Sequence, residues 1–432
     1  MTLSVTPTSQ PNTSPSFSKP NFNPTFSHPT TPTLPFNKSQ LAWDRLKSNS
    51  VECNSPPLGH KWTQYQGINH WEGLLDPLDD NLRAEILRYG HFVESAYRAF
   101  DFDTNSLTYA TCRFPETSLL PQTGMRKSGY RVTKNLQATC GVQLPSWISS
   151  MSQLPRVQSS WIGYVAVCED EKEIRRLGRR DVVIALRGTA TCLEWLENLR
   201  VTLTKLPEHM GCGSEECMVE NGFLSLYVSK TDTCPSLQDM VREEVARVIQ
   251  CYGHEPLSIS ITGHSLGAAL ALLCAYDITT TFKNSPMVSV VSFGGPRVGN
   301  DKFRAQLEKS GTRILRIVNS DDVITKVPGL VVPEDDVACS AGVHVAGLQT
   351  WFRKVVQDMQ LVYADVGQEL RVSSRESPYL KKGDVATCHD LKTYLHLVNG
   401  FVSSSCPYMS KTMQYPAEAS LWFFFQKLLQ CV

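Results

Sequence analysis

The chain has 432 residues, of which 41% are hydrophobic, so it is long and apolar enough to bury a large core. Its 42 Lys and Arg residues balance 42 Asp and Glu residues, and the resulting formal net charge of zero argues against a nucleic-acid partner or a general attraction to anionic lipid. The 14 cysteines form no pairs with Cys or His at zinc-binding spacing, so we expect no metal and no cofactor.

The cysteines indicate a reducing compartment. Cys112, Cys168 and Cys274 lie in apolar surroundings, which predicts small core residues. Cys212 and Cys217 are the nearest pair in the sequence, and a Cys-x4-Cys loop is only weak evidence for a redox-responsive disulfide.

The first 40 residues differ in composition from the rest of the chain. They hold 7 Ser, 8 Thr and 8 Pro, and no acidic residue precedes Asp44, so we expect disorder. No apolar run there is long enough for a secretory signal or a membrane span. Transit peptides have this composition, and the absence of Arg before Arg45 favours the chloroplast over the mitochondrion. We predict a transit peptide over residues 1–45 and one folded domain over residues 46–432; the alternative is an ordinary disordered tail.

Two amphipathic helices and several strands predict an α/β fold. Apolar residues recur at helical spacing in two segments: Leu82, Ile86, Tyr89, Val93, Ala96, Tyr97 and Phe100, then Leu237, Met240, Val241, Val245, Val248 and Ile249. Ser236 is a plausible N-cap for the second helix, and Gly253 ends it. Helices that alternate with strands predict a mostly parallel sheet with helices on both faces.

A buried strand over residues 181–186 is followed by Arg187, Gly188 and Thr189. Backbone donors at the end of such a strand are placed to stabilise an oxyanion, although Gly-Thr also occurs in ordinary turns. The segment from Thr189 to Gly222 is irregular, with apolar residues near its start, and is either a mobile lid or a simply packed loop.

The most informative motif is Gly-His-Ser-Leu-Gly at residues 263–267. Residues 257–262 alternate as a strand does, and residues 268–276 are small and strongly helical. Strand, sharp Gly-x-Ser-x-Gly turn and helix together indicate a nucleophile elbow, which holds a serine hydroxyl clear of the sheet. The N–H of Leu266, directly after Ser265, is then one oxyanion donor. Without that context the motif occurs by chance in unrelated proteins.

A nucleophilic serine needs a base and an acid, which follow it in this fold in the order acid, then histidine. A strand over residues 312–318 leads to Asp321 and Asp322, either of which is also an ordinary turn former. Of ten histidines, His389 and His396 follow the acid near a helix. We favour His389, which opens the helix, and regard His396 as structural. His264, inside the elbow, is expected to point away from the nucleophile.

These motifs, with their order and spacing, resemble the plant class 3 lipases, and more narrowly their chloroplast phospholipase A1 group. The resemblance extends over about residues 58–402 and rests on residues 61–78, 88–101, 161–167, 181–189, 194–195, 263–268, 293–300 and 389–396. It implies an α/β-hydrolase fold, selects Asp322 over Asp321, agrees with His389, and makes Thr189 the second oxyanion donor through its backbone N–H and hydroxyl. The loop at residues 211–217 and the long stretch between Pro328 and Trp351 depart from the pattern.

By resemblance, the protein is expected to be a serine acyl hydrolase that releases the sn-1 fatty acid of phosphatidylcholine, with galactolipids and triacylglycerol as further substrates. In a chloroplast, the linolenate it releases would feed jasmonate synthesis. Its partners are then glycerolipids at a membrane or lipid-droplet surface, touched peripherally and without a transmembrane span. The aromatic-rich residues 421–429 are either a docked terminal helix or an interfacial anchor. Two alternatives remain: a lipase-like signalling scaffold that does not need catalysis, and a soluble esterase for small substrates.

Overall fold

The computed structural model describes residues 57–139, 159–189, 203–210, 217–328, 363–380 and 385–400. The predicted transit peptide, Cys212, most of the candidate lid and the aromatic residues 421–429 lie outside these ranges.

The described chain is built on a seven-stranded sheet in the order β1-β2-β3-β6-β7-β8-β9. Strands β3 to β9 of this sheet run parallel, while β1 and β2 are antiparallel additions at one edge. The strands of the sheet are β1 (Tyr130–Thr139), β2 (Ser159–Cys168), β3 (Arg180–Leu186), β6 (Leu257–His264), β7 (Met287–Phe293), β8 (Arg313–Asn319) and β9 (Gln368–Val372). A separate hairpin pairs β4 (Leu203–Lys205) with β5 (Met218–Glu220). The expected mostly parallel sheet is confirmed.

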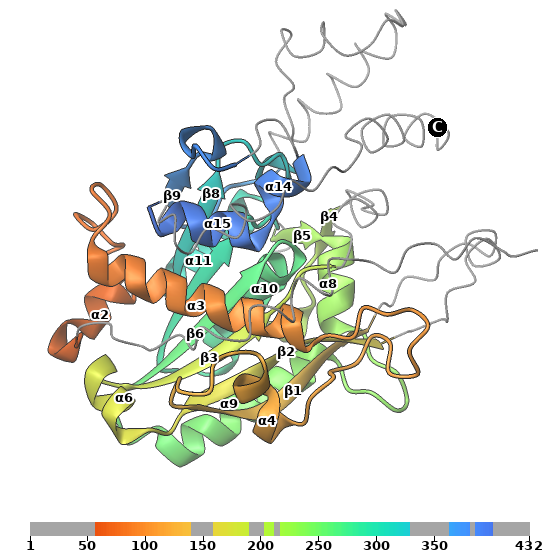
Figure 1. The fold of residues 1–432 in the computed structure, drawn as a ribbon. Helices are drawn as coiled ribbons and strands as arrows, with labels where there is room; N and C mark the ends of the chain where they lie inside the picture. The colour runs from red at the N-terminus through yellow and green to blue at the C-terminus, as the bar shows by residue number, and fades with distance from the viewer. Residues whose placement is uncertain are drawn as a thin grey trace, which may run out of the picture. The chain divides into compact units, whose positions relative to one another are not determined.

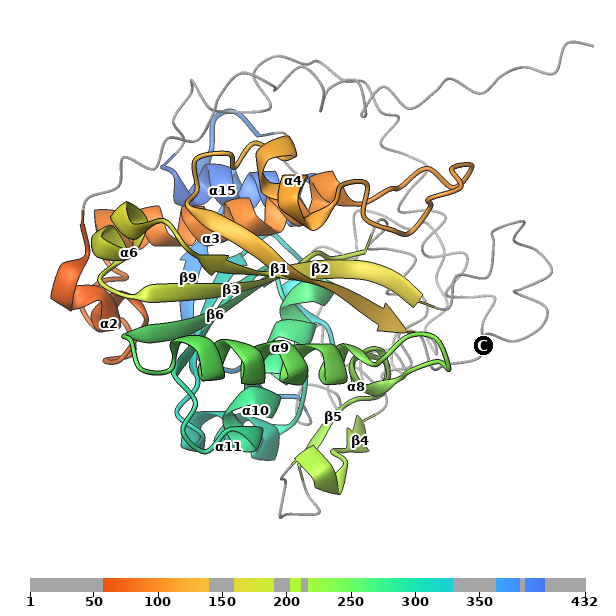
Figure 2. The same ribbon diagram turned by 90° about the horizontal axis from the view of Figure 1, so that it is seen from below.

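Helices cover both faces of this sheet, as Figures 1 and 2 show. One face carries α3 (Asp80–Ala99), α4 (Glu116–Gln122) and α15 (Leu391–Val398), and the other carries α8 (Asn221–Val228), α9 (Leu237–Tyr252), α10 (Leu266–Thr281) and α11 (Asp301–Lys309). The shorter helices are α2 (Trp62–Tyr65), α6 (Glu171–Leu177), α14 (Val385–His389), η1 (Gly59–Lys61), η2 (Glu208–Met210), η3 (Ile324–Lys326) and η4 (Ser374–Glu376). The chain therefore has the α/β-hydrolase architecture of a sheet between two helical layers. None of the helices among the described residues combines the length and apolarity needed to cross a membrane.

The two long amphipathic helices form where their sequences predict them. In α9 the Ser236 side chain accepts a hydrogen bond from the Asp239 N–H, and Gly253 follows the last turn, as expected. In α3 the Asp79 side chain accepts from the N–H groups of Asn81 and Leu82, which satisfies two donors of the first turn. Both helices bury one face against the sheet.

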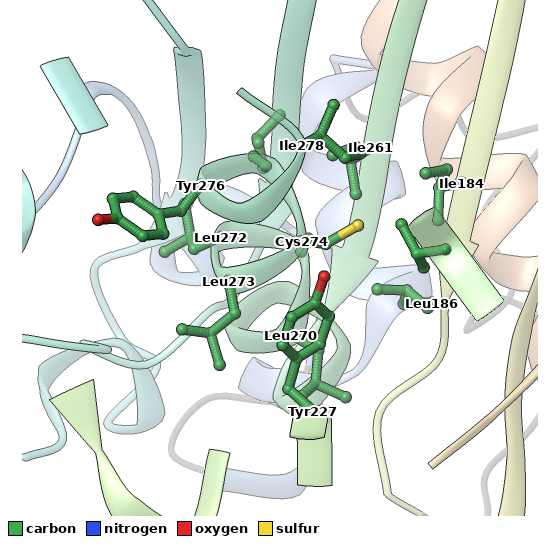
Figure 3. Close-up of a cluster of buried hydrophobic side chains, with 14 of the residues drawn as sticks. Ile184, Leu186, Tyr227, Ile261, Leu270, Leu272, Leu273, Cys274, Tyr276 and Ile278 are labelled. Carbon is green, nitrogen blue, oxygen red and sulfur yellow. The ribbon is translucent and has the colours of Figure 1, made fainter. Parts of the chain in front are cut away.

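Helix α10 differs from these because it is buried almost all round. Thirteen of its residues, from Leu266 to Ile278, are buried. Cys274 lies on the side of the helix that faces Ile184 and Ile261 of the sheet, whereas Leu272, Leu273 and Tyr276 point to the opposite side (Figure 3). The first turn of the helix approaches β3 closely, because a Cβ at Gly267 would lie only 2.4 Å from the Leu186 carbonyl oxygen. Cys274 lies in this core and Cys168 is also buried, as predicted, whereas Cys112 is only half-buried.

The polar residues of β6 do not face solvent. Ser258 and Ser260 are buried, and their hydroxyls donate to Asp181 Oδ1, each at 2.8 Å. Asp181 belongs to a buried ionic cluster with Glu85, Arg88 and Arg179, in which Arg88 Nη1 lies 3.1 Å from Asp181 Oδ2. Burial opposes the charge of Asp181, but the nearby Arg179 and Arg88 outweigh it and lower the pKa of this carboxyl to about 2.

Removing this buried charge should destabilise the fold. Asp181→Asn leaves two buried guanidinium groups with one carboxylate, which costs about 3–5 kcal/mol of unfolding free energy near neutral pH. The pKa of Asp181 is lower in the folded than in the unfolded protein. The difference in unfolding free energy between the wild type and the variant is therefore present above about pH 4 and is lost as the pH falls toward 2. Urea denaturation at several pH values measures it. Asp232→Asn, at an exposed aspartate, is the control and should leave stability unchanged; equal stability of the two variants would contradict the account.

Candidate active site

Ser265 occupies a sharp turn between β6 and α10. Its backbone has φ 58° and ψ −123°, a conformation that costs a non-glycine residue about 1–3 kcal/mol. The Ser265 N–H donates to the Phe293 carbonyl of β7 at 3.0 Å, which holds the strained residue between two strands. The serine is therefore fixed at the carboxyl edge of the sheet, directly before the N-terminus of α10.

Three glycines make this turn possible through close backbone approach. A Cβ at Gly263 would lie 2.3 Å from the Gly267 carbonyl oxygen, and one at Gly267 would lie 2.4 Å from that of Leu186. A Cβ at Gly188 would lie 3.0 Å from Ser265 Cβ. The end of β3 is thus packed directly against the nucleophile turn, which explains why the motif needs glycine on both sides of the serine.

Asp322 lies just beyond β8 and is fully buried. Its Oδ1 accepts from the Ile324 N–H at 2.9 Å, and its Oδ2 accepts from the Tyr394 hydroxyl at 2.6 Å. The neighbouring Asp321 faces elsewhere and pairs with exposed Arg375 at 2.7 Å. The structure therefore distinguishes two aspartates that the local sequence does not.

His389 Nδ1 lies 2.6 Å from Asp322 Oδ2, and both side chains are buried. The histidine was expected to open a helix, but it is instead the last residue of α14. Asp390 follows it as the N-cap of α15. His389 therefore lies at the junction between α14 and α15. His396 lies on α15, where its Nε2 is 2.9 Å from Ser377 Oγ.

His264 is not the predicted base, but it contacts the histidine that is. Its ring centroid lies 4.8 Å from that of His389, and its Nε2 is 2.7 Å from the His389 carbonyl oxygen. Because a carbonyl only accepts, Nε2 carries the proton and Nδ1 accepts from the Tyr97 hydroxyl at 2.7 Å. Burial, with the neighbouring His389, lowers the pKa of His264 well below its ordinary value, so the ring is neutral. His264 fixes the backbone of His389 from the residue directly before Ser265.

Further residues of the site carry no signal in the local sequence. Tyr97 comes from α3, and besides contacting His264 its hydroxyl accepts from the Gly188 N–H at 2.9 Å. Asn319, at the end of β8, donates to the Cys388 carbonyl at 2.8 Å and so holds the end of α14. Tyr394 lies on α15, and its hydroxyl donates to Asp322 Oδ2 at 2.6 Å.

The proposed oxyanion groups lie at the same edge. Leu266 is the first residue of α10, so its N–H has no acceptor within the helix. Thr189 lies next to Gly188, and its Oγ1 is buried with no hydrogen-bond partner among the described residues. A buried hydroxyl in this position is costly unless something binds it. Within the same part of the chain, no three His, Cys, Asp or Glu side chains are placed to hold a metal ion.

The sequence was then compared with known proteins. The family described as "Lipase (class 3)" matches residues 183–332. Phospholipase A(1) DAD1, chloroplastic, of Arabidopsis thaliana is 62% identical over 359 residues, which cover 81% of this chain and 79% of its own length. The chain belongs to the plant class 3 lipases.

Two further matches are more distant. Galactolipase DONGLE, chloroplastic, also of Arabidopsis thaliana, is 36% identical and covers 79% of this chain and 70% of its own. Among solved structures, nonglycosylated Yarrowia lipolytica LIP2 lipase aligns with a TM-score of 0.41 and 20% identity over 58% of this chain and 76% of its own. As a plant class 3 lipase, the protein is a carboxylic ester hydrolase, and like the two Arabidopsis thaliana relatives it is chloroplastic.

The contrast between the two aspartates yields a direct prediction. Asp322→Asn should lower kcat for ester hydrolysis by about 10⁴-fold, because an amide no longer holds the imidazole in the required tautomer. Asp321→Asn loses only contacts to Arg375 and Ser373 and should stay within a few-fold of the wild type. Steady-state kinetics on a soluble short-chain ester compare the two. Similar losses of kcat in both variants would contradict the assignment of Asp322, rather than Asp321, as the residue that orients His389.

Proposed function

We propose that the protein hydrolyses ester bonds with Ser265 as the nucleophile, His389 as the general base and Asp322 as the acid that orients it. The observation that carries this proposal is the 2.6 Å contact between His389 Nδ1 and Asp322 Oδ2, in a histidine whose backbone is hydrogen-bonded to His264. Because His264 directly precedes Ser265, base and nucleophile share one edge of the sheet. With Nδ1 held by the carboxylate, Nε2 is the nitrogen that acts on the serine.

The reaction then proceeds in two steps, acylation and deacylation of Ser265. Ser265 Oγ attacks the ester carbonyl while His389 Nε2 takes the hydroxyl proton, and the tetrahedral oxyanion is stabilised by the Leu266 N–H and by the N–H and hydroxyl of Thr189. Collapse breaks the bond to the alcohol, which leaves with the proton from His389. A water molecule, deprotonated by the same imidazole, then attacks the acyl-serine. The bond between the acyl carbon and Ser265 Oγ breaks, Oγ takes the proton back from His389, and the fatty acid is released. Each oxyanion donor is worth about 3 kcal/mol in the transition state.

We propose glycerolipids as the substrate, with release of the sn-1 chain of phosphatidylcholine and weaker action on galactolipid and triacylglycerol. Support comes from the relatives, one named phospholipase A(1) and another galactolipase. In the chloroplast, linolenate released in this way would supply jasmonate synthesis. Peripheral contact with a membrane or lipid-droplet surface follows from a substrate that resides there.

Two other functions make different predictions. A signalling scaffold would not need hydrolysis, and the buried, hydrogen-bonded Asp322–His389 pair weighs against it because such groups are costly to maintain without use. A soluble esterase would act on monomeric esters and show no rise in rate when the substrate forms micelles. Rates measured on both sides of the critical micelle concentration separate these functions.

The position of cleavage is tested with phosphatidylcholine that carries different acyl chains at sn-1 and sn-2. Because we assign phospholipase A1 activity, mass spectrometry of the freed acid should show mainly the sn-1 chain. Ser265→Ala, with the same fold, should release neither chain and so controls for a contaminating lipase. Dominant release of the sn-2 chain would overturn the assigned position of cleavage but not the hydrolytic mechanism.

We also propose that residues 1–45 form the transit peptide and residues 46–432 the catalytic domain. The first 60 residues fused to a fluorescent protein should enter chloroplasts, because this hydroxyl-rich segment holds no acidic residue before Asp44. The same fusion without residues 1–45 is the control. Cytosolic fluorescence of the complete fusion would refute the assignment.

A further inference from the structure

Arg187, the residue directly after β3, is a buried arginine whose hydrogen bonds all go to uncharged oxygens. Its Nε donates to the Trp161 carbonyl at 2.9 Å, its Nη2 to Ser160 Oγ at 2.9 Å and its Nη1 to the Gly188 carbonyl at 2.7 Å. The guanidinium also lies 3.5 Å from the centre of the Phe100 ring. Three hydrogen bonds and an aromatic ring therefore hold the side chain, and one of these bonds goes to the carbonyl of the next residue.

The lack of a counter-ion sets Arg187 apart from other buried arginines. Arg88 and Arg179 contact Glu85 and Asp181, whereas no carboxylate among the described residues pairs with Arg187. Burial lowers the pKa of Arg187 to about 10, so it stays charged at neutral pH. Keeping an uncompensated charge inside a protein is energetically costly, and a well-packed apolar residue would avoid that cost.

The position of this charge has a specific consequence. The Gly188 carbonyl and the Thr189 N–H belong to one planar peptide group, so a hydrogen bond to the oxygen shifts electron density toward it and makes the N–H a stronger donor. A charged donor does this more strongly than a neutral one. The preceding peptide is held as well, since the Gly188 N–H donates to Tyr97 Oη at 2.9 Å. The same glycine packs against Ser265, where a Cβ would lie only 3.0 Å from the serine Cβ.

We propose that Arg187 is a positioning residue that holds and polarises the Gly188–Thr189 peptide, so that the Thr189 N–H stabilises the negative charge of the transition state. This inference rests on the proposed function, because it assumes that Thr189 supplies an oxyanion donor. Arg187 touches neither the substrate nor the reacting atoms; it acts through one peptide bond.

The test uses Arg187→Gln and Arg187→Lys in the full-length protein, on a soluble short-chain ester. Glutamine removes the charge, so kcat should fall about tenfold or more, within the 10²–10³-fold lost with a whole oxyanion donor, while KM stays within about twofold. Lysine keeps the charge but lacks the planar guanidinium group, so the kcat of Arg187→Lys should lie between those of Arg187→Gln and the wild type. Arg180→Gln is the matched control, since Arg180 begins the same strand and pairs with Glu255 at the opposite end.

A second measurement separates this role from a purely structural one. An alkyl boronic acid forms a tetrahedral anion on the serine and needs the oxyanion donors, so its affinity should fall in parallel with kcat. If both Arg187 variants are folded and keep the wild-type kcat and boronate affinity, the inference is wrong. If Arg187→Gln does not fold, Arg187→Lys provides the test by itself. Unchanged boronate affinity in that variant would overturn the inference. Failure of the proposed function looks different, because Ser265→Ala would then remain active.

Discussion

The structure depends on one constraint: three backbone segments must meet closely enough to hold a serine in a strained turn. Gly263 and Gly267 let strand and helix approach within the turn, and Gly188 lets the end of β3 pack against it. The cost of the positive φ at Ser265 is met by the rigid burial of α10 and by the bond to Phe293. Nucleophile and oxyanion groups are thus brought together by the backbone rather than by side-chain contacts.

The acid follows β8 and the base ends α14 at the same carboxyl edge of the sheet, and a second set of contacts holds them. Asn319 and Tyr394 link the end of β8 to α14 and α15, and so bring Asp322 and His389 into contact across 67 residues of sequence. Neutral His264 then connects this pair to the elbow through the His389 carbonyl. Because these groups are buried, their electrostatic interactions are stronger than they would be in water.

The sequence predicts best where local patterns determine the structure. The elbow, the cap of α9 at Ser236 and the buried strand after Arg180 all depend on residues close in sequence. Asp321 and Asp322 occupy the same turn, so the residues alone left both open and only the family resemblance selected Asp322. The contact between His264 and Tyr97 could not be predicted, because it joins residues 167 apart in the chain. The buried polar face of β6 was equally invisible, since alternation does not reveal what a serine faces.

The central claim is that the elbow makes Ser265 the nucleophile, and covalent labelling tests it most directly. A fluorophosphonate reacts only with a serine that is activated by its base and faces an oxyanion site. Peptide mass spectrometry of the labelled protein should find a single phosphonyl group on the peptide that contains Ser265, and none when His389 is replaced by alanine. A label on another serine, or an active protein that takes up no label, would contradict the account.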